Sequence, residues 1–224
     1  MNEFVSIFEG TDPSTVSTSV KLLILLTILG LAPSILIMMT CFTRIVVVLS
    51  FVRTAIGTQQ APPNQILIGL SLFLTFFIMT PVFQEVNTVA LKPLLDDKIG
   101  IEESYEKASV PIKEFLSKNT RQKDLELFLG FSKSKKPTSV KDIPMTALVP
   151  AFAISELKTA FQMGFMIFIP FLIIDFIVSS VLMSMGMMML PPVIISLPFK
   201  ILLFVLVDGW HLVVKSLFMG FSGG

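Results

Sequence analysis

Two charged side chains, Asp175 and Lys200, interrupt an otherwise apolar stretch that runs from Phe161 to Leu206. A charge placed in hydrocarbon costs about 2.5 to 3.5 kcal/mol on insertion scales, so such a group needs either a partner or water. Charges in this setting serve as ion sites or as polar contacts between packed helices. These two residues are therefore the first candidates for chemistry in this chain.

The spacing of the two charges argues against a direct pair within one tight hairpin. If the chain reverses at Pro191-Pro192, Asp175 lies about 16 residues before the bend and Lys200 about 8 after it. At about 1.5 Å per residue, their depths then differ by about 12 Å. Either a kink at Pro198 shortens this gap, or each charge meets a residue of a neighbouring, axially staggered subunit. We expect the second arrangement, with the charges fastening subunits together, and an ion site in a wet cavity is the alternative.

A group of methionines lies just before the same bend. Its members are Met183, Met185, Met187, Met188 and Met189. Methionine is flexible and polarisable, so it repacks around varied contents. Repeated around a ring of subunits, Met187 to Met189 would form a deformable apolar constriction, and such a constriction gates by excluding water. Gap-filling in an ordinary core is the alternative, but the neighbouring Gly186 and the proline bend favour a loop tip.

Two arginines, Arg44 and Arg53, are the only charges of the first hydrophobic hairpin after Lys21. Because Lys and Arg in short loops favour the cytosolic side, they are candidates for the cytosolic end of that hairpin. The termini and the charged insertion described below would then lie outside.

No constellation typical of an enzyme occurs in the sequence. The chain has no Gly-rich phosphate loop with its lysine. Its single histidine, His211, and single cysteine, Cys41, are far apart and lack metal-ligand spacing. The net charge of +1 gives no argument for a nucleic-acid partner. We therefore expect no enzymatic activity, no cofactor, no metal site and no nucleic-acid partner.

The composition indicates the elements that must position these residues. The chain is 53% hydrophobic and only 15% charged, which is typical of an integral membrane protein. Phe165 to Leu190 is apolar except for Asp175 and three serines. As one helix it would reach about 39 Å, more than the roughly 30 Å of a bilayer core. The chain has one Trp and one Tyr beside 13 Met and 21 Phe. Trp and Tyr usually anchor lipid-facing helices at the membrane interfaces, so their scarcity favours helices that mostly touch other protein. Compositional drift is the alternative explanation.

We predict an all-α protein built from helical hairpins with a water-exposed helical insertion. The expected segments are a polar N-terminal stretch (1–20), a first hydrophobic hairpin (21–84), the charged insertion (85–142), a second hydrophobic hairpin with the Met-rich loop (143–221) and a tail (222–224). Four hydrophobic blocks result. The acidic start does not resemble a signal peptide, so we expect the first block to remain in the mature protein.

The insertion holds most of the charged residues and two predicted helices. From Ile101 to Lys118, Tyr105 and Phe115 share one apolar face with Ala108, Ile112 and Leu116. Pro111 lies inside this pattern and is a candidate point of division. A second, shorter helix is expected around Leu125 to Leu129, closed by Gly130. The lysines between 133 and 136 are expected in a loop.

Three long motifs give the chain a resemblance to a known family. They are RIVVVLSFVRTAIGTQQAPPNQILIGLSLFLTFFIMTP, AFAISELKTAFQMGFMIFIPFLIIDFIVSSVLMSMGMMMLPP and ISLPFKILLFVLVDGW. They resemble the FliP family of the flagellar type III export gate, which has counterparts in virulence-type secretion systems. The match covers nearly the whole chain from about Leu22.

The resemblance implies a pore subunit of the bacterial inner membrane and the flagellar basal body. It implies a helically arranged homopentamer joined by FliQ-like and FliR-like subunits, with FlhA-like and FlhB-like export components nearby, that conducts unfolded flagellar proteins. By resemblance, Met187, Met188 and Met189 form a gasket that limits leakage. Residues Glu156, Asp175 and Lys200 would make polar contacts within or between subunits. A proton- or ion-coupled secondary transporter with Asp175 as the coupling site is the alternative.

Overall fold

The structure is a computed structural model, and it describes residues 22–23, 26–27, 29–31, 33–35, 37–58, 60–131, 137, 139–187 and 189–222. The chain divides into two compact units, Met1–Met38 and Met39–Gly224. Met188, the basic segment 132–136 and the N-terminal residues 1–21 lie outside the described residues. The expectations for the N-terminus and for the lysine loop therefore stay predictions.

In the first unit, residues 22–23, 26–27, 29–31, 33–35 and 37–38 are helical. The Thr27 hydroxyl donates to the backbone oxygen of Leu23 at 2.8 Å. Threonine hydroxyls within helices commonly make this bond to the carbonyl four residues earlier. Residues 22–38 thus have helical backbone wherever they are described.

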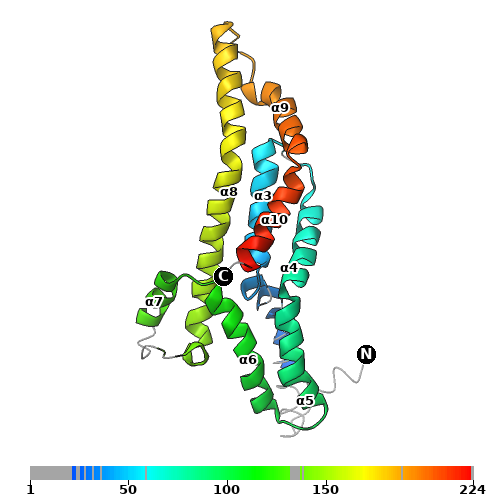
Figure 1. The fold of residues 1–224 in the computed structure, drawn as a ribbon, viewed down its shortest axis with the longest axis vertical. Helices are drawn as coiled ribbons and strands as arrows, with labels where there is room; N and C mark the ends of the chain where they lie inside the picture. The colour runs from blue at the N-terminus through cyan, green and yellow to red at the C-terminus, as the bar shows by residue number, and fades with distance from the viewer. Residues whose placement is uncertain are drawn as a thin grey trace. The chain divides into compact units, whose positions relative to one another are not determined.

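The second unit is a set of helices, and its described residues include no strand (Figure 1). The prediction of an all-α fold is confirmed. The elements are α3 (Phe42–Ile56), α4 (Asn64–Val86), the π-helical η1 (Asn87–Leu91), α5 (Lys92–Leu95), α6 (Ile101–Lys118), α7 (Gln122–Phe131), the 3-10 turn η2 (Val140–Asp142), α8 (Met145–Ser184), α9 (Pro192–Leu206) and α10 (Gly209–Ser222).

Helix α3 forms the centre of this unit, flanked by α8 and α4 and reached by α9. One of its faces is completely buried at Ile45, Val48, Leu49 and Val52. These residues recur at helical spacing, so burial of this stripe explains why a strongly β-branched sequence stays helical here. On the neighbouring side, an added Cβ at Gly164 of α8 would lie 2.4 Å from the ring of Phe51. The glycine therefore allows α3 and α8 to approach closely.

Helix α8 runs for 40 residues despite two internal prolines, Pro150 and Pro170. It ends at Ser184, and Gly186 then takes a positive φ of 74°, a conformation that costs glycine nothing. The chain reverses over residues 185–191, and Pro192 occupies the first turn of α9, where its missing N–H is not needed. The bend is therefore wider than the reversal at Pro191-Pro192 that we expected.

Helices α9 and α10 meet at an elbow of 61°. Asp208 adopts a positive φ of 50° at the break. An added Cβ on Gly209 would lie 2.3 Å from the ring of Phe204, so only glycine fits beside that ring. Past this break α10 lies alongside α3, and its Val213 and Leu217 join the same apolar cluster as the buried face of α3 (Figure 1).

The charged insertion differs in detail from the prediction. Helix α4 does not end near residue 84 but continues through η1 and α5, so that one helical segment spans Asn64–Leu95. Helix α6 has the bounds we expected, and Pro111 does not divide it. Tyr105 does not join the buried face, since its side chain is 69% exposed, whereas Ser104 is buried and donates to the Ala90 oxygen. The prediction for Tyr105 was therefore wrong by one position.

A second, smaller apolar cluster fixes the insertion to α8. It is formed by Leu116, Ile143, Leu148 and Phe152. Helix α7 has no buried residue of its own and closes past Gly130, at Phe131. Its main packing partner is α8.

Two helical segments are long and apolar enough to cross a membrane, Asn64–Leu95 and Met145–Ser184, and the bent pair α9 and α10 makes a third if it counts as one span. Within the described residues this is fewer than the four blocks expected from the sequence, because the first block is described only in part and α3 is shorter than a span. The most apolar windows of the two long segments are only 22% and 11% buried within this chain. Most of their apolar surface therefore remains available to lipid or to other protein.

Candidate functional site

Asp175 and Lys200 meet directly within one chain. The Lys200 Nζ donates to Asp175 Oδ2 at 2.6 Å, and the Ser196 hydroxyl donates to Asp175 Oδ1 at 2.5 Å. The lysine side chain is 4% exposed and the aspartate side chain 25% exposed. We call these three residues the hairpin node, because they join α8 to α9.

The prediction that Asp175 and Lys200 do not pair directly was wrong, because the chain does not reverse at Pro191-Pro192 alone. The reversal spreads over residues 185–191, so Asp175 lies about 9 residues before the end of α8 and Lys200 about 8 after the start of α9. At about 1.5 Å per residue the two positions have nearly equal depth. Both charges are therefore satisfied inside the chain.

The hairpin node also touches the end of α3. Gly57 ends that helix with a φ of 89°, and a Cβ added there would lie 3.9 Å from Lys200 Nζ. The C-terminus of a helix carries a partial negative charge that favours a cation. Lys200 thus lies between a carboxylate and a helix C-terminus, and three helices converge on its charge.

A second ion pair lies deeper in the unit. Arg44 Nε donates to Glu156 Oε2 at 2.8 Å, and a second bond joins Arg44 Nη2 to Glu156 Oε1. The exposed fractions of the two side chains are 4% and 0%. Arg44 also donates to the Gly220 oxygen at 3.2 Å, and its guanidinium lies 3.8 Å from the centre of the Phe221 ring. We call this pair and its two α10 contacts the core node.

The core node corrects the interpretation of Arg44 as a charge at the cytosolic end of a hairpin. Arg44 stands at the start of α3 and is buried, so it does not lie in an exposed turn. Arg53 does lie at the α3–α4 turn, where it donates to Asn64 Oδ1 at 2.6 Å and to the Pro62 oxygen at 3.4 Å. Only Arg53 keeps the position that the sequence argument required.

The methionines occupy the end of the α8–α9 hairpin. Met183 and Met185 are 64% and 66% exposed, and Met187 and Met189 are 40% and 99% exposed. Met188 lies outside the described residues. The methionines described here do not fill a gap in the core of this chain, and the loop tip stands at the far end of α8 from helices α6 and α7 (Figure 1).

A third polar cluster holds α7 to α8 and was not expected from the sequence. The Ser155 hydroxyl donates to Asp124 Oδ2 at 2.6 Å, and Arg121 Nη2 donates to the same oxygen at 2.6 Å. Although partial burial acts to raise the pKa of Asp124, the bonds from Ser155 and Arg121 hold that pKa below its usual value. The carboxylate therefore stays charged and keeps both bonds at neutral pH.

Among the described residues, no group of three or more His, Cys, Asp or Glu side chains could hold a metal ion. The Cys41 thiol is fully buried, and burial raises the pKa of Cys41 to about 12, so the thiolate that would act as a nucleophile is not populated. His211 is exposed on α10.

The sequence reasoning missed the core node as a pair. A signal was available for Arg44, because it is the only charge between Lys21 and Arg53, and a lone charge in a hydrophobic hairpin needs a partner. Glu156 gave a weaker signal, since Lys158 lies two residues after it. The Asp124–Ser155 contact had no such signal, since both residue types are ordinary on exposed helices.

The fold and these nodes define a class of all-helical protein whose helices reach membrane-spanning length and whose buried charges are paired internally. The sequence profile of the FliP family matches residues 25–217, and the chain belongs to the FliP family. The resemblance seen in the three motifs is thereby confirmed.

Three relatives illustrate the match. The chain is 71% identical over 221 residues to the flagellar biosynthetic protein FliP of Bacillus subtilis, covering 99% of this chain and 100% of that protein. It is 53% identical to the flagellar biosynthetic protein FliP of Caulobacter vibrioides, covering 98% and 83% of the two chains. It is 56% identical to the protein of that name from Aquifex aeolicus, covering 89% and 84%.

Proposed function

We propose that this FliP-family chain is a pore-forming subunit of the flagellar type III protein export gate, without enzymatic activity. In this proposal five copies assemble with FliQ-like and FliR-like subunits and conduct unfolded flagellar proteins across the bacterial inner membrane at the flagellar basal body. FlhA-like and FlhB-like export components are the expected neighbours. The observation that carries the proposal is the exposed methionine tip of a hairpin whose two helices are joined by the hairpin node.

The methionine tip is proposed as the closing gasket of the channel. Its described side chains find little cover in their own chain, with Met189 99% exposed. Flexible thioether side chains brought together around an axis would exclude water at rest and repack around a passing polypeptide. A single chain cannot close such a ring, so the gasket requires the homo-oligomer.

The hairpin node is proposed to hold this tip in position. A buried salt bridge contributes little net stability, but its geometry specifies how the two helices align. The quarter of the Asp175 side chain that remains exposed is available to a neighbouring subunit, so a contact between subunits can coexist with the pair inside the chain. Arg53, at the α3–α4 turn, is proposed for the cytosolic side.

The geometry favours the gate over a secondary transporter. Both oxygens of Asp175 already accept hydrogen bonds, from Ser196 and from Lys200. A coupling ion would have to displace the lysine, and removing one partner from such a pair is strongly unfavourable. The two proposals also differ in copy number, because a carrier works as a monomer or small oligomer.

The test is deletion of residues 187–189 in the complex assembled with its neighbouring subunits. We expect ion conductance across a bilayer to rise while native mass spectrometry still shows the assembled complex with five copies of this chain. A control deletion of equal length in the 132–136 segment should leave conductance unchanged. Unaltered conductance in the methionine deletion would contradict the proposed gasket. A single copy of this chain per complex would contradict the proposed pore.

A further inference from the structure

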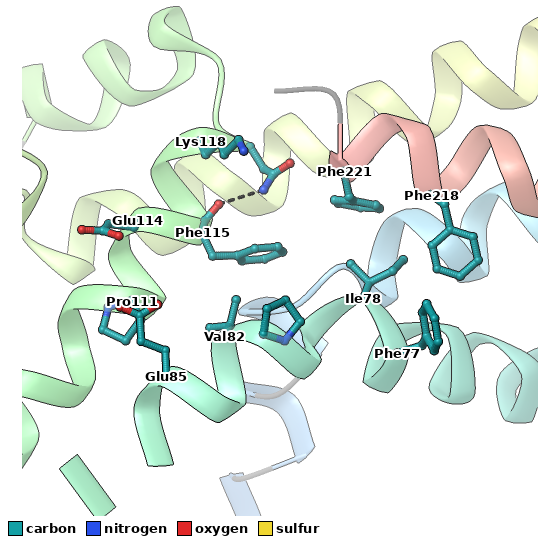
Figure 2. A pocket seen from close by; sticks show the side chains of 12 residues that line it. Phe77, Ile78, Val82, Glu85, Pro111, Glu114, Phe115, Lys118, Phe218 and Phe221 are labelled. Atoms are coloured by element: carbon teal, nitrogen blue, oxygen red, sulfur yellow. Dashed lines mark hydrogen bonds between the residues drawn. The ribbon is translucent and has the colours of Figure 1, made fainter. Parts of the chain in front are cut away.

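A pocket of about 510 Å³ opens where α4, α6 and α10 meet (Figure 2). Its apolar walls are formed by Phe77, Pro81, Val82, Phe115, Phe218 and Phe221. This volume lies within the range of about 300 to 1,000 Å³ that is usual for ligand pockets. None of its lining residues belongs to α8 or α9, so the pocket is separate from the methionine tip and the hairpin node.

Two carboxylates lie on one rim of the pocket. Glu85 comes from α4 and Glu114 from α6, and both side chains are exposed on the side of the pocket away from Phe218 (Figure 2). Neither takes part in a salt bridge within the described part of the chain. Two unpaired carboxylates from different helices thus border an aromatic pocket.

Two helix ends add to this negative character. Helix α6 ends at Lys118 and α10 at Ser222, and both last turns line the pocket. Helix C-termini carry partial negative charge. Against these groups stand Lys118 on the rim and Arg44, which is paired with Glu156 and also donates to the Gly220 oxygen at the end of α10. The two carboxylates therefore supply most of the negative character. The rim is therefore complementary to a cation.

We propose that this pocket binds a segment of a partner protein that presents one or two bulky apolar side chains beside lysine or arginine. The apolar side chains would enter between the phenylalanine rings, where aromatic contacts add to area burial. The basic groups would reach Glu85 and Glu114. An anionic phospholipid fits the pocket poorly, because its phosphate would lie beside the same two carboxylates.

The test uses the purified full-length chain in its assembled complex and two fluorescein-labelled helical peptides. One peptide carries Leu and Phe on one face, flanked by lysines, and the other has glutamate in place of each lysine. Fluorescence anisotropy should show tighter binding of the basic peptide. In the double variant Glu85→Lys, Glu114→Lys we expect about tenfold weaker binding of the basic peptide and a reversed preference, because each exposed ion pair contributes modestly.

A matched double variant, Glu102→Lys with Glu106→Lys, reverses two exposed charges of α6 away from the pocket and should leave both affinities unchanged. Val82→Phe fills the pocket and should weaken both peptides, with the assembled mass checked by native mass spectrometry.

Three results would overturn the proposal. The first is equal binding of both peptides regardless of the rim charges. The second is a change of copy number in the rim variant, since the pocket would then be covered by a second copy. The third is loss of a co-purified phospholipid in Val82→Phe, which would assign the pocket to lipid.

Discussion

The two ion pairs of this chain are alike in chemistry and different in setting. The core node is closed on every side, with its carboxylate fully buried and its guanidinium held by two bonds to that carboxylate, a carbonyl and a ring. The hairpin node keeps a quarter of its carboxylate exposed and joins the two helices whose loop carries the methionines, about two turns from that loop. The comparison indicates that removing one partner of the core node would leave an uncompensated buried charge, whereas the hairpin node sets the alignment of a hairpin.

The largest effect is expected from Glu156→Gln. The substitution leaves the buried Arg44 charge without a counter-charge, and breaking a buried pair in this way costs about 3 to 5 kcal/mol. The thermal midpoint of the purified chain should fall sharply, and recovery of the complex should fall with it. A loss of under about 1 kcal/mol would contradict the closed setting of the core node.

A smaller effect is expected from Asp175→Asn. The amide keeps the shape and one acceptor for Ser196, but the bond to the Lys200 charge is weakened, at about 1.5 to 3 kcal/mol for a hydrogen bond to a charged group. We expect reduced recovery of the assembled complex, while the isolated chain keeps its helical circular dichroism. Normal recovery together with a selective loss of ion-coupled transport would instead favour the transporter.

Gly57→Ala examines the third contact of the hairpin node. The position has a φ of 89°, and left-handed backbone costs about 1 to 2 kcal/mol for a residue with a side chain. The new methyl group would also lie near Lys200. The free energy of unfolding, measured by denaturant titration of the purified chain, should fall by about 1 to 2 kcal/mol. Gly130→Ala serves as the control, because Gly130 has open space around it.

The smallest effect is expected from protonating Asp124 at low pH. This carboxylate belongs to the polar cluster that holds α7 to α8. Its pKa is lowered in the folded state, so its contribution to stability is fully present above the ordinary aspartate pKa and is lost as pH falls through the lowered folded value. Hydrogen exchange of the α7 amides should therefore accelerate selectively in that acidic range. The variant Asp124→Asn should show the faster exchange already at neutral pH and little further change.

Much of the fold followed from composition and hydrophobic spacing, because long apolar runs and lone charges leave few choices. The bounds of α6 were predicted correctly. The depth of Asp175 relative to Lys200 was not, because the width of a turn depends on how Gly186 and the following residues leave α8. The continuation of α4 to Leu95 was also missed, since Pro81 and the charged stretch that begins at Glu85 resemble the end of an apolar helix.

The candidate site was predictable by residue type and not by pairing. The sequence singled out the methionines and the lone charges, since each is unusual in its surroundings. The pairing of charges depends on how the helices pack, for example on the close approach of α3 to α8 at Gly164. No local sequence pattern specifies the relative positions of two packed helices.

The core node has a consequence for the order in which the chain is made. Arg44 and Glu156 are 112 residues apart, and the Gly220 carbonyl is 176 residues beyond the arginine. At about 5 to 20 residues per second, roughly 6 to 22 s of synthesis separate the arginine from its carboxylate. During that interval helix α3 leaves the ribosome with an uncompensated cation, so the first hairpin can settle only after α8 has emerged.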